Sequence, residues 1–306
     1  MLLSQFPKFK HYSNKETLKI TKDTFLSDPA SDLSPAYLPG YYNVSNSLKL
    51  CELNGNLVIT FVNPETNKHT FQIFGNRQIK NSILAIFKYQ SANGYEQIIE
   101  ELNESQHKRI TTADIYTERA EDCDDYILST QDHRDLTHPK LKAEARAVRH
   151  FIRKYGDDIK IFELDLTNHE SISLIINAWH SWKQYFKSTN NDPDAIERKY
   201  ISMYLMHADE LPTKNFIISH ANQIIAFAIY DINEKQNCVI LHTLKVDYAY
   251  NHVFDFGLHA IASRLYSEGF RLLNIEEDLG ITGLRNKKNR LLPIKKIQKY
   301  RAYPTR

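Results

Sequence analysis

The amino-acid sequence predicts an α+β fold, and three observations support this prediction. The chain has 306 residues, about twice the 150 residues of an average domain, so two domains are expected. Apolar residues make up 42% of the chain and charged residues 25%, which is typical of a folded protein with a buried core. Strand and helix patterns in the second half do not alternate regularly, and such mixing favours α+β over a doubly wound parallel sheet.

The first half is predicted to form strands and one helix after an irregular lead-in. Residues 1–35 contain Asp-Pro and Ser-Pro pairs, which interrupt regular structure. The Asn54-Gly55 pair stands between two apolar runs, which is a strong signal for a β-hairpin. Apolar residues at helical spacing predict one helix. The predicted elements are strands 49–53, 56–62 and 70–74 and a helix over 95–102.

The second half begins with a basic helix, predicted over 140–154 and ended by Gly156. The helix predicted over 170–186 is amphipathic, with its large apolar residues on one face. Apolar runs separated by turn residues predict the other elements. They are strands 160–164, 215–219, 224–230, 238–247, 271–276 and 294–300 and helices 195–206, 254–267 and 284–290.

The sequence excludes several classes of protein. No apolar run reaches the roughly 18 residues of a transmembrane helix, and residues 1–22 lack the apolar core of a signal peptide. Cys51, Cys123 and Cys238 are far apart and match neither a disulfide framework nor a metal-binding spacing. A P-loop and a nucleophile elbow are absent, and no metal is expected. The three scattered cysteines predict a reducing, cytoplasmic location.

Charge is distributed unevenly, although the net charge is only +2. Residues 94–125 carry ten acids and three bases, whereas residues 285–306 carry nine bases and no acid. Such a basic segment attracts polyanions, but a solvated basic tail is an equally simple interpretation.

The segment over residues 274–285 reads Asn-Ile-Glu-Glu-Asp-Leu-Gly-Ile-Thr-Gly-Leu-Arg and continues through Lys288 and Pro293 to Tyr300. This pattern resembles the C-terminal signature of a bacterial family named after the cytoplasmic domain of phosphatidylglycerol lysyltransferase. The resemblance also covers residues 125–155 and is collinear from about residue 35. Two features depart from the family: Glu144-Ala145-Arg146 is less positive than in many relatives, and the multi-pass membrane part is missing.

The resemblance implies two tandem GNAT-like domains (acyl-CoA N-acyltransferase-like), each with a mixed, mostly antiparallel sheet flanked by helices. The N-terminal domain would be the degenerate partner, and the C-terminal domain would carry the working site. The implied divisions are an irregular segment 1–35, a degenerate GNAT-like domain 36–138, a basic linker helix 139–156 and a C-terminal GNAT-like domain 157–306.

GNAT enzymes hold acyl-CoA with a glycine-containing loop, whose helix N-terminus binds the pyrophosphate. The corresponding stretch, 247–257, has bulky Val253 and Phe254 in the loop and Asp255 near the helix start. A carboxylate there would cap the helix and repel a phosphate. The stretch therefore disfavours ordinary CoA binding. The resemblance implies aminoacyl-tRNA as the donor, because relatives that use charged tRNA do not need this loop, and acyl-CoA is the alternative donor.

Amine acylation needs a base for the attacking amine. Alternation along strand 271–276 places Asn274 and Glu276 on one face, and Asp278 follows. Glu276 or Asp278 is predicted to act as the base or to orient the acceptor, with Asn274 beside them. Alternatively, Asp278 caps the next helix and Arg285 is its ion-pair partner.

Basic residues are expected to hold donor phosphates. Arg285 and Lys288 are assigned to the donor, and Lys287 and Arg290 belong to the same cluster. A second stripe follows the basic helix at steps of three and four residues, with a solvated face as the alternative interpretation. This stripe comprises Lys142, Arg146, Arg149 and Arg153.

Two further side chains are candidates for donor binding. Tyr248 follows the predicted third meander strand and could stack on a base, although such tyrosines are more often packing residues. His242 lies in that strand and could point into the cleft, although most such histidines are structural.

Three functions remain open. The first is aminoacyl transfer to an amine or hydroxyl acceptor, either a small molecule or a peptide. The second is acyl-CoA-dependent N-acyl transfer with an atypical phosphate loop. The third is a non-catalytic protein that binds RNA or a partner through the same cleft. The sequence does not define the acceptor, the acyl group or the oligomeric state.

Overall fold

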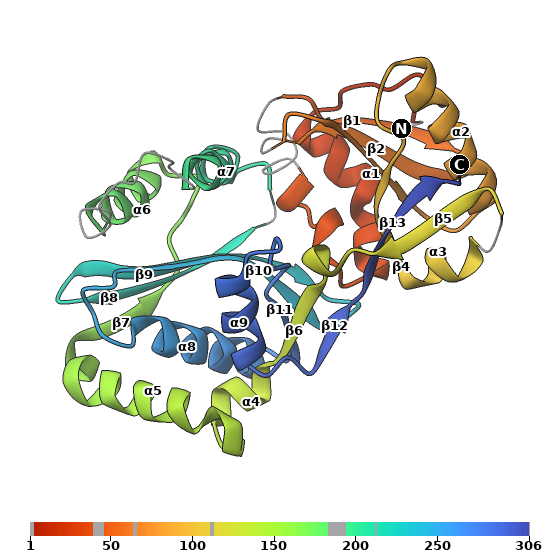
Figure 1. Cartoon of the computed structure of the whole chain (residues 1–306). Helices are drawn as coiled ribbons and strands as arrows, with labels where there is room; N and C mark the ends of the chain where they lie inside the picture. Colours follow the sequence, from red (N-terminus) through yellow and green to blue (C-terminus); the bar gives the residue numbers. More distant parts are fainter. Residues whose placement is uncertain are drawn as a thin grey trace.

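The computed structural model describes residues 3–38, 46–63, 66–110, 113–182, 194–211 and 213–305. It forms two lobes in which helices pack on sheets (Figure 1). This architecture confirms the predicted α+β class. Both ends of the chain lie in the smaller N-terminal lobe, in the upper right of Figure 1.

The N-terminal lobe contains two three-stranded antiparallel sheets. The β1–β2 hairpin confirms the turn predicted at Asn54-Gly55, where both residues have the positive φ that a two-residue hairpin favours. The first sheet has the order β1 (Lys49–Leu53), β2 (Asn56–Val62) and β3 (His69–Phe74). The second has the order β4 (Ile99–Asn103), β13 (Lys299–Pro304) and β5 (Ile115–Arg119). The helices of this lobe include α2 (Ile79–Ala92) and α3 (Glu104–Arg109).

The helix predicted over 95–102 is wrong, because this stretch leads into strand β4. Ile99 and Leu102 are both fully buried, and their spacing of three imitates a helix. The spacing arises because Glu101 has a left-handed φ of 59° and the register with β13 shifts next to Tyr300. The irregular pairing therefore breaks the two-residue alternation of an ordinary strand.

The predicted irregular lead-in is also wrong in part, because α1 (Asn14–Ser27) lies within it. Ser13 and Glu16 form a capping box that satisfies backbone N–H groups at the start of this helix. The Asp-Pro pair that suggested irregular structure begins at Asp28, directly after the helix ends. A short 3-10 turn, η1 (Ser31–Leu33), follows.

The C-terminal lobe is built on one seven-stranded sheet, in which β10 and β11 form a parallel pair and the other pairs are antiparallel. The strand meander and the following strand occur where the sequence predicts them. The order across the sheet is β12 (Lys295–Ile297), β6 (Asp125–Ser129), β11 (Leu272–Asn274), β10 (Cys238–Val246), β9 (Gln223–Asn233), β8 (Lys214–His220) and β7 (Ile159–Phe162).

Helices cover both faces of this sheet (Figure 1). One face packs on α5 and α8 through a core that includes Phe151 and Ile261, and the other packs on α6 and α7 through Trp179 and Tyr204. Helices α5 to α9 confirm the predicted ones, whereas the short α4 has no predicted counterpart; residues 183–186 of the predicted helix 170–186 lie outside the described residues. Their bounds are α4 (Thr130–Asp135), α5 (Lys142–Tyr155), α6 (His169–Trp182), α7 (Asp194–Met206), α8 (Val253–Ser267) and α9 (Thr282–Arg290).

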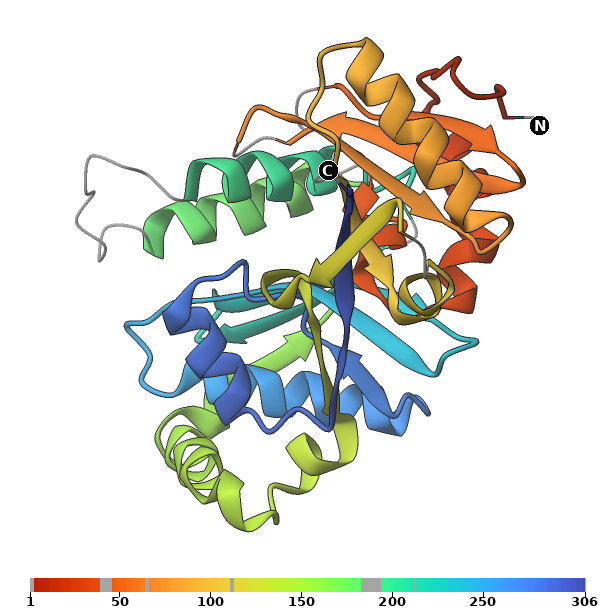
Figure 2. The ribbon, with the colours of Figure 1, turned by 45° about the vertical axis from the view of Figure 1, so that its right-hand side comes forward.

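The two lobes exchange strands. The predicted last strand, 294–300, is in fact two strands, because β12 pairs with β6 and β13 then crosses to pair with β4 and β5. Figure 2 shows this C-terminal segment passing from the lower lobe to the upper one. In turn, β6 lies inside the seven-stranded sheet between β11 and β12. The lobes are therefore interlocked. The exact domain boundaries that the sequence suggests stay a prediction.

Candidate functional site

The candidate site lies where β10 and β11 part. These strands pair only from Cys238 to Ile240, and a register shift against β9 follows between Leu241 and Thr243. After β11 the chain continues along β6, with the Ile275 N–H donating to the Tyr126 carbonyl. The irregularity of β10 and the end of β11 place His242 and Glu276 beside each other.

His242 is the centre of a buried hydrogen-bond network. Its Nδ1 lies 2.7 Å from Glu276 Oε1, and its Nε2 lies 3.1 Å from Ser34 Oγ. The Ser34 hydroxyl donates to Asp231 Oδ2 at 2.5 Å. Burial would lower the pKa of His242, but the Asp231 and Glu276 carboxylates outweigh it and raise the pKa to about 9. The ring is therefore an imidazolium at neutral pH, and both nitrogens donate.

Tyrosines and a second glutamate surround this network. The Tyr204 ring lies 5.3 Å from the His242 ring, and the Tyr200 hydroxyl donates to the Tyr204 hydroxyl. Tyr37 donates to Glu277 Oε1 at 3.0 Å. Burial raises the pKa of Glu277 to about 7, against the opposing effect of nearby lysines. The site is acidic and lined with aromatic rings.

The backbone at Glu276 is strained. Glu276 has a φ of 59°, which costs a residue other than glycine about 1 kcal/mol. The Asn274 side chain stabilises this conformation, because its Oδ1 accepts the Glu276 N–H at 2.7 Å. Asn274 Nδ2 in turn donates to Asp125 Oδ2 and to the Pro29 carbonyl. Strain of this kind is often found at functional sites.

The two predicted catalytic carboxylates have different surroundings. Asp278 is fully buried and accepts two hydrogen bonds from Arg285, one from the Tyr126 hydroxyl and one from the Gly280 N–H. Burial opposes them, but these donors together hold the pKa of Asp278 below its usual range. The side chain of Glu276 keeps 15% of its surface exposed, against 0% for Asp278. Only Glu276 of this pair lies in the His242 network.

The structure agrees with the alternative in which Arg285 is the ion-pair partner of Asp278. It contradicts the alternative in which Asp278 caps the next helix. The N-cap of α9 is Ile281, and no side chain caps this helix. The predicted catalytic role of Asp278 stays a prediction that this geometry does not favour.

The predicted phosphate-binding residues do not form one cluster. Lys288 is buried, and its Nζ donates to the Ile275 and Glu277 carbonyls, so it supports the strained loop from inside. Lys287 Nζ lies 3.4 Å from the centre of the Phe254 ring, and burial lowers the pKa of Lys287 to about 8. Arg290 is exposed on α9.

The other predicted contacts lie on the surface. Arg146, Arg149 and Arg153 are exposed along α5, as their spacing indicates. Tyr248 is 57% exposed in the turn after β10. These donor and RNA roles remain predictions.

The predicted cap at the start of α8 is wrong. The N-cap is His252, with a φ of 66°, and no side chain caps the first turn. Asp255 Oδ2 lies 3.8 Å from His252 Nδ1 instead. The carboxylate therefore adds negative charge there but leaves the backbone N–H groups of the first turn without a side-chain acceptor.

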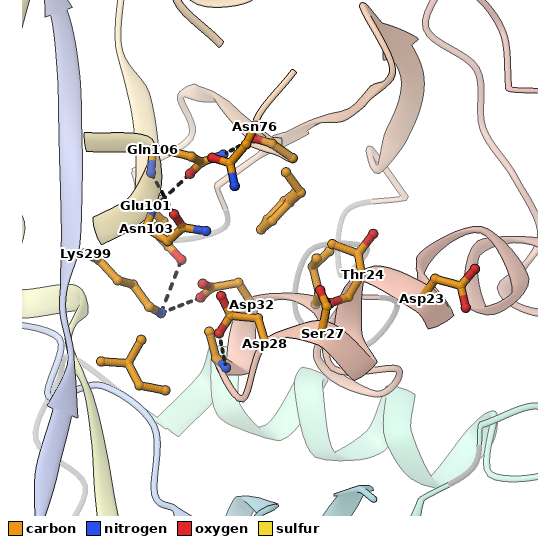
Figure 3. A pocket seen from close by; sticks show the side chains of 15 residues that line it. Asp23, Thr24, Ser27, Asp28, Asp32, Asn76, Glu101, Asn103, Gln106 and Lys299 are labelled. Carbon is orange, nitrogen blue, oxygen red and sulfur yellow. Dashed lines mark hydrogen bonds and ion pairs between the residues drawn. The ribbon is translucent and has the colours of Figure 1, made fainter. Parts of the chain in front are cut away.

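A cavity of about 290 Å³ lies between the α1–η1 segment and the β3–β4–α3 region of the N-terminal lobe. Figure 3 shows Lys299 reaching from β13 toward Asp32 and Glu101 at its inner end. Lys299 Nζ lies 2.5 Å from Asp32 Oδ1 and 3.2 Å from Asp125 Oδ1. Burial would lower the pKa of Lys299, but these carboxylates raise it well above its usual range. The buried cluster anchors η1 to both lobes.

Sequence reasoning identified Glu276, Asn274 and His242 but missed several residues that the fold adds. Asp231 interrupts an apolar strand, which is a signal that could have been used. Ser34 and Tyr37 carry no such signal, because they lie in or next to a lead-in whose sequence shows no regular apolar pattern. In the part of the chain that the structure describes, no His, Cys, Asp and Glu side chains group in a way that could hold a metal ion. No described helix is long and apolar enough to cross a membrane.

Solved structures with the same fold cover nearly the whole chain. A conserved protein of unknown function from Bacteroides thetaiotaomicron has a TM-score of 0.84 at 20% identity, over 97% of this chain and 99% of that one. The C-terminal domain of a putative lysylphosphatidylglycerol synthetase from Agrobacterium fabrum has a TM-score of 0.67 at 12% identity, over 96% and 92%. L-PGS from Bacillus licheniformis has a TM-score of 0.62 at 11% identity, over 94% and 91%.

Comparison of the sequence with known protein families identifies the family of this chain. No curated protein matches the chain. The family described as phosphatidylglycerol lysyltransferase, C-terminal, matches residues 45–303, which is most of the sequence and both lobes. These residues include the whole segment from Asn274 to Arg285 that carried the resemblance. The chain therefore belongs to the phosphatidylglycerol lysyltransferase C-terminal family, and it shares the fold of the solved lysylphosphatidylglycerol synthetase domains.

Proposed function

We propose that this protein transfers an aminoacyl group from an aminoacyl-tRNA to an amine or hydroxyl acceptor. The observation that supports this most is the Glu276 carboxylate, held by an imidazolium at the parting of β10 and β11. A fixed and partly exposed carboxylate is suited to take a proton from an attacking nucleophile. Membership of the lysyltransferase family supports the choice of reaction class.

In this reaction the acceptor nitrogen or oxygen attacks the ester carbonyl of the donor. Its proton passes to Glu276, the new amide or ester bond forms, and the bond to the tRNA breaks. The leaving ribose oxygen then takes a proton, so that the carboxylate is restored. The acidic surroundings, with Glu276 and Glu277 adjacent, favour an acceptor or aminoacyl group that carries a positive charge.

The donor would be held by exposed cations. Arg290 on α9 and the α5 stripe face solvent, whereas Lys288 and Asp278 are committed to internal contacts. Arg285 keeps 36% of its side chain exposed while it pairs with Asp278, so it remains a candidate for a phosphate contact. Each such contact makes binding more sensitive to salt.

The test combines binding and transfer. Glu276→Gln should retain binding of fluorescent tRNA but lose transfer by about 100-fold or more, as expected for loss of a general base. Glu170→Gln, an exposed change on α6, is the matched control and should behave like the wild type. Reversal of Arg149 and Arg153 to Glu should weaken tRNA binding most at low salt. Absence of salt-sensitive tRNA binding in the wild type contradicts the proposal.

A second candidate is an acyl-CoA-dependent N-acyltransferase, and the start of α8 favours it. The first turn of α8 has no side-chain cap, and such N–H groups can bind a phosphate. A thermal shift with acetyl-CoA distinguishes the two donors, because a ligand that binds the folded state raises its stability. A shift with acetyl-CoA and none with tRNA would select this second function.

A further inference from the structure

We propose that Ser34 and Asp231 are positioning residues that fix the His242–Glu276 pair, so that the N-terminal segment 31–38 completes the site. This inference rests on the proposed role of Glu276. The segment lies before residue 45, where the family match begins.

The segment is held against both lobes by contacts between residues far apart in the sequence. The Ser31 N–H and hydroxyl both donate to Asp125 on β6, at 2.8 and 2.9 Å. Asp32 pairs with Lys299 from β13. The Ala36 N–H donates to Asp231 Oδ2 at 2.8 Å. These contacts lie on both sides of Ser34 in the sequence, so they fix the position of Ser34.

The Ser34 hydroxyl bridges the imidazolium and the Asp231 carboxylate, whose Oδ2 also lies 3.3 Å from His242 Nε2. His242 Nε2 donates to Ser34 Oγ, and Ser34 donates to Asp231 Oδ2. On the other side of the ring, Nδ1 donates to Glu276. A continuous chain of hydrogen bonds therefore runs from Asp231 to Glu276 and fixes the ring orientation, in the way that a carboxylate orients a catalytic histidine.

The burial of Ser34 defines its kind of role. Ser34 has 0% exposed surface, so its hydroxyl does not reach a substrate. It acts through His242 and Glu276, as a positioning residue and not as a nucleophile. Tyr37 strengthens the same interface, because this residue of the segment donates to Glu277 next to the base.

The protonation of His242 depends on groups from four directions. Asp231 approaches from β9 and Glu276 from the loop after β11. Ring contacts come from Tyr37 in the segment and Tyr204 on α7. Tyr200 and Glu277 lie one contact farther away. Ser34 holds Asp231 Oδ2 close to His242 Nε2, at 3.3 Å, and only the protonated ring can donate to Ser34 while Nδ1 donates to Glu276. Removal of the Ser34 hydroxyl therefore favours loss of the ring proton.

The experiment compares Ser34→Ala with Ser82→Ala in the full-length chain. Ser82 is equally buried and accepts hydrogen bonds in the N-terminal lobe, away from the site, so it controls for loss of a buried hydroxyl. Nitrogen NMR of the His242 ring should show a titration midpoint about one pH unit lower in Ser34→Ala, since a hydrogen bond to a charged group is lost. Ser82→Ala should leave the midpoint unchanged.

Transfer kinetics supply the second readout. Ser34→Ala should lower kcat by about tenfold with little change in KM, and it should shift the alkaline limb of the pH–rate profile in parallel with the midpoint. If Ser34→Ala does not fold, Asp231→Asn provides the same test from the other end of the network. An unchanged midpoint and pH profile in a folded variant overturn the inference.

The NMR titration needs no activity, so the two proposals can fail separately. A lowered midpoint in a protein without transferase activity would support the positioning of His242 and contradict the proposed reaction. An unchanged midpoint, with transfer still lost in Glu276→Gln, would support the reaction and remove Ser34 from it.

Discussion

Replacing His242 with glutamine should remove a specific part of the pH dependence of folding. His242 is buried between Asp231 and Glu276, and its pKa is raised to about 9. A histidine in the unfolded chain titrates near pH 6.5. The folded state therefore holds a proton that the unfolded state loses between these two values. The resulting stabilisation is complete below about pH 6.5 and is lost as the pH rises toward 9.

The size of the effect follows from the shift. A difference of about 2.5 pH units, at 1.36 kcal/mol for each unit, corresponds to about 3 kcal/mol. Typical domains are stable by about 5–15 kcal/mol, so a change of this size is easily measured. The wild-type free energy of unfolding should fall by about 3 kcal/mol more than that of His242→Gln between pH 6.5 and pH 9.

Urea denaturation at several pH values measures this difference directly. His180→Gln, an exposed change on α6, serves as the control and should follow the wild-type curve. The comparison cancels other groups that titrate in the same range, such as Lys287. Curves for wild type and His242→Gln that run parallel to within 0.5 kcal/mol, roughly the noise of such data, would refute the reasoning. If His242→Gln does not fold, a titration midpoint below pH 7 for His242 in the wild type would refute the reasoning instead.

Three further predictions concern the architecture. Lys299→Met should cost about 3–5 kcal/mol in urea denaturation, because Asp32 and its neighbouring carboxylates lose their buried cation; wild-type stability would contradict this. Gly75→Ala should destabilise far more than Gly94→Ala, since both glycines have positive φ but only the new Cβ at 75 meets another atom, Asn56 Oδ1 at 2.5 Å. Equal thermal shifts would show that this clash is absent. Removal of residues 299–306 should unfold the N-terminal lobe, because β13 is the central strand between β4 and β5; unchanged near-UV circular dichroism would contradict this.

Local patterns predicted many of the elements correctly. The Asn54-Gly55 hairpin follows from turn chemistry within a few residues. The amphipathic faces of α5 and α6 follow from apolar spacing along one helix. The same kind of reasoning pointed to Glu276 but placed it on a strand, whereas β11 ends at Asn274 and Glu276 lies in the loop that follows, with a φ of 59°. Each of these features is encoded by neighbours in the sequence, so the sequence reports it directly.

Patterns failed where a distant segment decides the local structure. The pattern around strand β4 predicts a helix, because the shifted pairing with β13 gives the buried residues of this strand a helical spacing. The split of the last predicted strand into β12 and β13 depends on which lobe each half pairs with. Helix α1 is hidden in the lead-in, because the Asp-Pro breaker directly after it favours irregular structure.

The sequence by itself determined the fold class, the family signature at residues 274–285 and the involvement of Glu276, Asn274 and His242 in one region. The tertiary structure alone decided which carboxylate joins the histidine and which is committed to Arg285. It also brought Ser34 to His242 across 208 positions of the sequence. Contacts over such separations depend on strand exchange and buried ion pairs between lobes, and no local periodicity records them.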